Sequence, residues 1–235
     1  MKDILQEIVA TKRAEVDRRK RGTDLQTLYR QAETPRTTRH SLREALRSSS
    51  TGIISEFKRR SPSKGWINRD ADVQSVVRAY QQAGATALSI LTDTPYFGGT
   101  DDDLRAARQA CSLPILRKDF TIDEFQLVES RALGADAVLL IAAALTREQC
   151  RRFAEIAHQL ELEVLLEIHD QSELDYYSEY VDVLGVNNRN LGSFHTDVAN
   201  SFRLIEQMPQ EATPISESGI SNPDAVKELR AIGFK

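Results

Sequence analysis

The sequence predicts an α/β fold in which the strands of a parallel sheet alternate with helices. Short β-branched or Leu-rich segments begin only at Gly52, and each is followed by an amphipathic helical segment. This repeated order requires a parallel sheet with right-handed connections. The composition agrees, because 235 residues that are 40% hydrophobic and 28% charged suffice for one buried core.

The first 47 residues have a helical pattern of their own. Apolar residues repeat at helical spacing in three stretches, within 4–16, 25–28 and 42–46. We therefore expect residues 1–47 to form a helical extension packed on a second unit, residues 48–235. The basic run at 18–21 lies beside Glu15 and Asp17, which favours a solvated helix face over a nucleic-acid site.

Seven strands and seven helices follow this extension. The strands are predicted at 53–57, 87–91, 115–117, 137–141, 164–168, 183–187 and 214–216. The helices are predicted at 73–82, 104–109, 123–132, 147–159, 171–177, 197–207 and 223–232.

Sequence motifs also indicate whether the sheet is open or closed into a barrel. An open doubly wound sheet would normally carry a Gly-rich phosphate fingerprint after its first strand, and neither G-x-G-x-x-G nor G-x-x-x-x-G-K-[ST] occurs. A closed barrel needs one more unit, and the chain stops just after Gly233, where an eighth strand would begin. We predict a (β/α)8 TIM barrel whose final βα unit is absent from this sequence, with Phe234 at the edge of the missing strand.

Composition excludes several classes of protein. The net charge is −4, no apolar stretch is long enough for a membrane span or an export signal, and two cysteines form no disulfide framework. A reduced, cytoplasmic location follows, with neither a membrane nor a nucleic-acid partner. The four histidines do not have metal-ligand spacing, so no metal is expected.

Ionisable and amide side chains stand at nearly every predicted strand end, where an α/β barrel builds its active face. Lysines beside carboxylates there suit general acid and base chemistry; the alternative is that they only form ion pairs with one another. These residues are Glu56, Lys58, Lys118, Asp119, Glu167, His169, Asn187, Asn188, Arg189, Glu217 and Ser218.

Two loops have the composition of substrate contacts. Ser218 and Gly219 would present backbone N–H groups as half of a phosphate cradle, although Ser-Gly is also a common turn. The loop Ser61-Pro-Ser-Lys-Gly is hydroxyl-rich and cationic, and it suits an anionic ligand or an ordinary surface loop. Trp66, Phe97 and Phe120 follow strand ends, where they would wall an aromatic substrate or anchor loops.

Seven motifs in this order closely resemble indole-3-glycerol phosphate synthase, an enzyme family of tryptophan biosynthesis. The match runs from about residue 50 to 233, and the helical extension resembles that family's extra N-terminal helices. The motifs are ISEFKRRSPSKGWI (54–67), LTDTPYFGGT (91–100), ILRKDFTIDEFQ (115–126), GADAVLLIAAAL (134–145), VLLEIHD (164–170), LGVNNRNL (184–191) and ISESGI (215–220).

The resemblance implies ring closure, decarboxylation and dehydration of 1-(o-carboxyphenylamino)-1-deoxyribulose 5-phosphate without a cofactor or metal. It implies Lys118 as the general acid, Glu167 as the acid/base partner in dehydration, and a proton-transfer role for Lys58. It implies that Glu56, Asn187 and Glu217 orient the lysines and the substrate. The phosphate would contact Arg189, Ser218 and Gly219, and the aromatic ring would contact Phe97, Phe120 and Leu139. We expect a small phosphorylated substrate and a monomer or weak homo-oligomer.

Two other functions stay open at this point. A sibling barrel could isomerise another aminodeoxyribulose phosphate, although such isomerases usually use a Cys/Asp or Asp/Asp pair rather than two lysines and a glutamate. A non-catalytic fragment would expose the edges of its first and seventh strands and depend on pairing with another chain.

Overall fold

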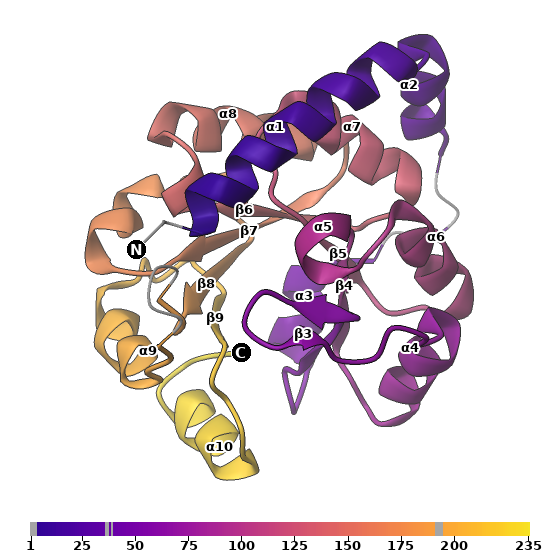
Figure 1. The fold of residues 1–235 in the computed structure, drawn as a ribbon. Helices are drawn as coiled ribbons and strands as arrows, with labels where there is room; N and C mark the ends of the chain where they lie inside the picture. The colour runs from indigo at the N-terminus through magenta and orange to yellow at the C-terminus, as the bar shows by residue number, and fades with distance from the viewer. Residues whose placement is uncertain (1–3, 36–37, 39, 191–194) are drawn as a thin grey trace.

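Seven parallel strands form one curled sheet in the computed structural model, which describes residues 4–35, 38, 40–190 and 195–235 (Figure 1). Strands adjacent in this order along the chain are also hydrogen-bonded neighbours, which is barrel topology. The predicted strands agree within one residue at each end. They are β1 (Ile54–Phe57), β4 (Ala87–Leu91), β5 (Ile115–Lys118), β6 (Ala137–Ile141), β7 (Glu163–Ile168), β8 (Val183–Asn187) and β9 (Pro214–Glu217).

Helices cover the outer face of this sheet. The helix predicted at 171–177 is present, but it is the 3₁₀ helix η2 (Gln171–Tyr176) and not an α-helix. There the Asp170 carboxylate accepts the backbone N–H of Ser172 at 2.8 Å, which competes with α-helical bonding. The remaining outer helices are α4 (Val73–Gln82), α6 (Asp101–Ala110), α7 (Glu124–Leu133), α8 (Arg147–Gln159), α9 (Ala199–Leu204) with η3 (Ile205–Gln207), and α10 (Pro223–Ala231).

Small elements in the loops after the strands escaped prediction. The loop after β1 contains a hairpin, β2 (Arg60–Ser61) and β3 (Gly65–Trp66), which includes the predicted hydroxyl-rich loop. Two further short elements, α5 (Thr94–Phe97) and η1 (Ala142–Ala144), follow β4 and β6. All these segments lie at the carboxyl end of the sheet.

The helical extension consists of α1 (Ile4–Gly22), α2 (Leu25–Glu33) and α3 (Leu42–Ser48). Helix α1 crosses the outside of the fold above α7, and α2 packs on α7 (Figure 1). Helix α3 places fully buried Leu42 and Leu46 against strand residues such as Leu116 and Leu139. Its apolar side chains therefore fill the inside of the sheet, and the opposite end stays open for a site. Residues 1–3, 36–37 and 39 of the predicted extension, and the last residue of the motif at 184–191, lie outside the described residues.

Strands β1 and β9 form the two edges of the described sheet. The last residue lies between them: the Lys235 N–H donates to the carbonyl of Pro214 at 2.9 Å, and the Lys235 backbone also approaches Gly52. Phe234, expected at this edge, is buried at 3% exposure. Within the described ranges, no helix combines the length and apolar character that a membrane span needs.

Candidate active site

A cavity of about 1010 Å³ runs from the carboxyl ends of the strands along the space between β9 and β1, where Gly52, Arg230 and Lys235 also line it. Because parallel strands end at the same edge, side chains from distant parts of the sequence meet there. The structure brings all thirteen predicted site residues to its wall: Glu56, Lys58, Ser61, Phe97, Lys118, Phe120, Leu139, Glu167, Asn187, Arg189, Glu217, Ser218 and Gly219.

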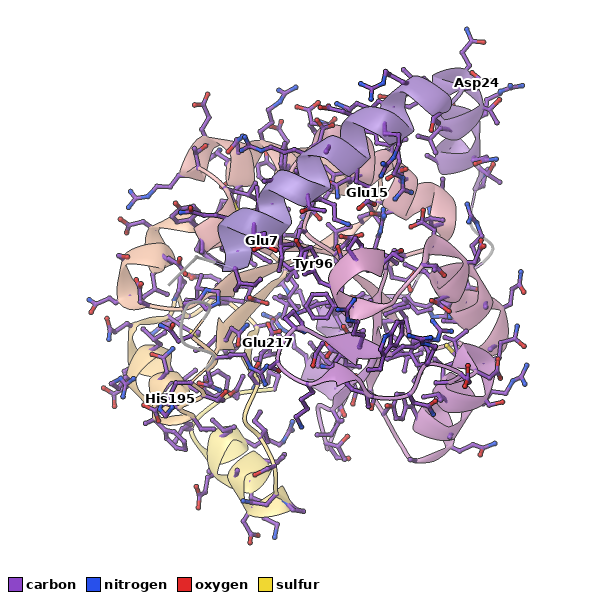
Figure 2. All side chains as sticks on the ribbon, in the orientation of Figure 1. Glu7, Glu15, Asp24, Tyr96, His195 and Glu217 are labelled. Atoms are coloured by element: carbon purple, nitrogen blue, oxygen red, sulfur yellow. The ribbon has the colours of Figure 1, made fainter. Side chains whose placement is uncertain are left out.

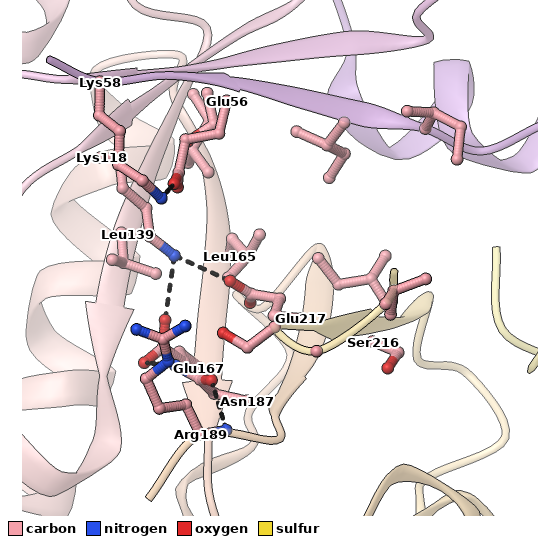
Figure 3. A pocket seen from close by; sticks show the side chains of 18 of the residues that line it. Glu56, Lys58, Lys118, Leu139, Leu165, Glu167, Asn187, Arg189, Ser216 and Glu217 are labelled. Atoms are coloured by element: carbon pink, nitrogen blue, oxygen red, sulfur yellow. Dashed lines mark hydrogen bonds and ion pairs between the residues drawn. The ribbon is translucent and has the colours of Figure 1, made fainter. Parts of the chain in front are cut away.

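Lys118 is the centre of the charged cluster in this cavity (Figure 3). Its Nζ donates to Glu217 Oε2 at 2.8 Å and to Glu167 Oε2 at 3.1 Å. Within the described residues, Glu217 Oε1 has no hydrogen-bond partner, although it is buried. The groups therefore do more than satisfy one another, because a buried acceptor is left for a ligand.

Gly185 on β8 makes room for the Glu217 carboxylate. A Cβ atom at this position would lie 2.3 Å from Glu217 Oε1, so any other residue would displace the side chain. The glycine of the motif at 184–191 thus fixes where a carboxylate of the neighbouring strand lies.

Burial and charge act in opposite directions on these groups. Burial alone would lower the pKa of Lys118, but Glu217, Glu167 and Glu56 raise this pKa above the usual lysine value. Burial alone would raise the pKa of Glu167, but Lys118 and His169 hold it below its usual value. Burial raises the pKa of Glu217, and the nearby Lys118 offsets this only in part. The resting site therefore holds an ammonium group beside an ionised Glu167.

A second lysine–carboxylate pair lies beside Lys118 (Figure 3). Lys58 donates to Glu56 at the end of β1, and both side chains are about one-third exposed. This pair is more accessible than Lys118, which is 17% exposed. Two ammonium groups therefore face one cavity in different environments.

Asn187 at the end of β8 orients the Glu167 carboxylate. Asn187 Nδ2 donates to Glu167 Oε1 at 2.9 Å, and Asn187 Oδ1 accepts the N–H of Arg189 at 3.0 Å. Asn188 points the other way and binds Ser216 Oγ and the carbonyl of Glu217. Asn188 therefore links β8 to β9 by hydrogen bonds and does not line the cavity.

The turn after β9 has two consecutive residues with positive φ. Ser218 and Gly219 have φ values of 67° and 76°, in the left-handed region. A Cβ at Gly219 would lie 2.4 Å from Thr196 Cγ2, so glycine is required here for contact as well as conformation. Arg189 reaches the loop after β1, where Nη1 donates to Ser63 Oγ at 3.4 Å.

Apolar residues form the other side of the cavity. The Phe97 and Phe120 rings lie with centroids 6.1 Å apart and planes inclined at 37°. Leu5 and Ile8 of α1 also line it, although their helical spacing indicated only a core face. Tyr96 beside this wall donates from its hydroxyl to Glu7 at 3.3 Å, which ties α5 to α1 (Figure 2).

Three residues from the predicted strand ends and loops have other surroundings. Asp119 lines the cavity, but its carboxylate binds Lys12 of α1 at 2.9 Å. His169 lies behind Glu167 and is absent from the cavity wall, as is Trp66, whose ring is flanked by Arg60 and Arg69. Strand-end position alone did not distinguish His169 and Trp66 from wall residues. In the described part of the chain, no group of three or more His, Cys, Asp or Glu side chains is arranged for a metal ion.

Solved structures share this fold. A variant of the tryptophan synthase alpha-subunit from Pyrococcus furiosus superposes with a TM-score of 0.57 at 14% identity, covering 77% of this chain and 84% of the other. The YdjI aldolase from Escherichia coli K12 gives 0.56 at 17% identity, covering 84% of this chain and 79% of the other. At these identities the likeness concerns the fold alone.

Sequence relatives are far more similar. Indole-3-glycerol phosphate synthase from Bacteroides thetaiotaomicron is 56% identical over all of this chain and 90% of its own length. The protein of that name from Neisseria meningitidis serogroup B is 44% identical, over 99% of this chain and 91% of its own length. The family profile described as indole-3-glycerol phosphate synthase matches residues 5–235. The chain belongs to the indole-3-glycerol phosphate synthase family.

Proposed function

We propose that this protein converts 1-(o-carboxyphenylamino)-1-deoxyribulose 5-phosphate into indole-3-glycerol phosphate, carbon dioxide and water. It is thus a carbon–carbon lyase of the carboxy-lyase class that acts in tryptophan biosynthesis. The observation that carries the proposal is Lys118, held between Glu167 and Glu217 in a cavity that also has an apolar wall.

Lys118 acts as the general acid of ring closure. When the aromatic carbon attacks the ketone, negative charge develops on the ketone oxygen, and an adjacent ammonium can donate a proton to it. Glu167 is the acid/base partner in the loss of water, and Lys58 takes part in proton transfer. Glu56, Asn187 and Glu217 orient the lysines and the substrate hydroxyl groups.

The two ends of the substrate bind at opposite sides of the cavity. Phe97, Phe120 and Leu139 hold the aromatic ring, whereas Arg189, Ser218, Gly219 and Ser61 hold the phosphate side. Holding both ends aligns the reacting carbons, which can contribute up to about 7–11 kcal/mol to lowering the barrier.

Three further statements belong to this proposal. Residues 1–47 are a helical extension and 48–235 are units one to seven of the barrel; an eighth βα unit outside this sequence closes the gap between β9 and β1 and completes the phosphate site. The enzyme works in the cytoplasm as a monomer or weak homo-oligomer, without a nucleic-acid partner. No cofactor or metal takes part.

The test follows indole fluorescence after mixing the substrate with this 235-residue chain and with a chain extended by one βα unit. Turnover by the extended chain alone supports both the site and the role of an eighth strand. Absence of turnover by both chains, each shown to be folded by circular dichroism, would contradict the proposal. The sibling isomerase would then be assayed with its own aminodeoxyribulose phosphate.

A further inference from the structure

His169 lies between two carboxylates just behind the cavity. Its Nε2 is 3.4 Å from Glu167 Oε1, and its Nδ1 is 3.4 Å from Glu173 Oε2. Both ring nitrogens are buried, and neither completes a hydrogen bond within the described residues. A small movement of the ring toward either side would bring a nitrogen within the usual 2.7–3.2 Å of a carboxylate oxygen.

The backbone of His169 is held by two hydrogen bonds, whereas its ring completes none among the described residues. Its N–H donates to Glu173 Oε2 at 2.6 Å, and its carbonyl accepts Asn200 Nδ2 at 2.8 Å. Glu167 is 3% exposed, whereas the His169 and Glu173 side chains are each 14% exposed. The three residues therefore form a line from the buried wall of the cavity toward more accessible positions.

The charges around the ring favour its protonated form. Carboxylates act on it from three elements: Glu167 of β7, Glu173 of η2 and Glu217 of β9; α9 presents the neutral amide of Asn200, and Lys118 lies beyond Glu167. Burial alone would lower the pKa of His169, but the contact with Glu173 and the charge of Glu167 raise it above the usual histidine value.

The proposed reaction requires one proton from water in each turnover. Ring closure adds a proton to the ketone oxygen, and a second proton leaves with that oxygen as water. The carboxylate leaves as carbon dioxide, and its bonding electrons restore the aromatic ring. One proton is then lost from the carbon next to nitrogen as the indole double bond forms. Two protons enter and one leaves, so the net uptake is one.

We propose that His169 is a positioning residue that relays a proton to Glu167; this rests on the proposed function. In the relay the Nε2–H bond breaks and the proton passes to Glu167 Oε1, which leaves a neutral ring that keeps Nδ1–H toward Glu173. Glu167 gives this proton to the leaving hydroxyl group, takes up the proton lost from the carbon next to nitrogen, and returns it to Nε2. The proton taken from water in each turnover restores the ammonium form of Lys118. Glu167 itself is ionised at rest, so it needs such a neighbour to act as an acid in dehydration.

The test compares kcat and KM between pH 6 and 9 for the wild type, His169→Gln and Glu173→Gln. His158→Gln is the matched control, because this histidine of α8 binds Asp182 at 2.8 Å and does not line the cavity. We expect His169→Gln to lower kcat about 10- to 100-fold at pH 8 with KM within about twofold, and Glu173→Gln to lower kcat less. His158→Gln should match the wild type.

A second variant separates proton transfer from structural loss. His169→Gly leaves space for free imidazole, which should restore at least half of the lost kcat. The relay is wrong if His169→Gln keeps the wild-type kcat across this pH range, or if imidazole restores nothing in folded His169→Gly. Either result leaves the proposed function intact as long as the wild type turns over; a folded wild type without turnover would contradict both.

Discussion

Two lysines of this molecule lie among carboxylates, and they differ in burial and in what lies beside them. Lys12 of α1 binds Glu15, Asp93 and Asp119 at 2.9–3.0 Å and is 1% exposed. Lys118 of β5 binds two carboxylates and is 17% exposed, next to the cavity.

The difference shows that a lysine among carboxylates can either stabilise the fold or take part in chemistry. Around Lys12 the ionic cluster continues into protein: Asp119 also accepts from Thr92, and Arg117 binds Thr92 and Ser130. Around Lys118 one oxygen of Glu217 has neither a hydrogen bond nor an ion pair among the described residues, whereas Asp93 Oδ2, which also completes no hydrogen bond, still lies 3.0 Å from Lys12 Nζ. The closed cluster fixes α1 on the loop after β5, whereas the open one can accept substrate.

The largest difference should be in turnover. Lys118→Met removes the proton donor and should reduce kcat about 10²- to 10⁴-fold, because general acid catalysis typically contributes that much. Lys12→Met should keep turnover per folded molecule within about tenfold. Indole fluorescence, normalised to the folded fraction from circular dichroism, measures both. Equal losses in the two variants would remove the distinction between the clusters.

For stability, Lys12→Met should have a larger effect than Lys118→Met. Lys12→Met leaves uncompensated buried carboxylates and should lower the free energy of unfolding by about 3–5 kcal/mol. Guanidinium denaturation measures the change, and Lys12→Arg should recover part of it. A Lys12→Met protein within about 1 kcal/mol of the wild type would show that the closed cluster does not hold the fold.

Neutralising Asp119 or Glu217 should change the free energy of unfolding in opposite directions. Burial alone would raise the pKa of Asp119, but Lys12 and Arg117 hold it below its usual value. Its stabilising contribution is therefore present above the unfolded pKa of about 3.9 and is lost as pH falls through the folded value. The pKa of Glu217 is raised, so its contribution is present below about pH 4.3 and is lost as pH rises.

At pH 7, Asp119→Asn should consequently lower the free energy of unfolding, and Glu217→Gln should raise it, each on the order of 1 kcal/mol. Denaturation at pH 7 and pH 3 measures both effects, which should shrink in acid. If Glu217→Gln destabilises the protein at pH 7, the Glu217 carboxylate, with its unpartnered Oε1, is not a cost to folding.

The smallest effect should come from an exposed ion pair. Arg151 and Glu179 approach to 2.6 Å, but both are about 60% exposed. Arg151→Ala should change the free energy of unfolding by less than about 0.5 kcal/mol, because water screens such pairs. The same denaturation experiment measures it, and a loss as large as that of Lys12→Met would contradict the argument from burial.

Sequence patterns predicted the elements that depend on local signals. The strands are short apolar runs bounded by polar or glycine residues, and their ends agree within one residue. The wall residues at strand ends could be predicted because barrel topology places all strand ends together, whereas Leu139, inside β6, was expected only from the family resemblance. The buried position of Lys12 could not be predicted. In the sequence, Lys12 and Glu15 look like an ion pair on a helix surface, and only the fold places Asp93 and Asp119 beside this lysine.

The contacts of His169 and the 3₁₀ form of η2 have the same origin. Both depend on where Glu173 and Asp170 direct their carboxylates, which the apolar spacing does not encode. The hairpin β2–β3 and helix α5 are too short for periodicity to reveal.

A crystal structure with indole-3-glycerol phosphate bound is the most direct test of the open cluster as the active site. We predict the indole ring between Phe97, Phe120 and Leu139, with its C2–C3 edge facing Lys118 and Glu167. The phosphate should contact Arg189 and the turn at Ser218 and Gly219. A product bound with its phosphate beside Phe97 and Phe120, or outside the cavity, would contradict the account.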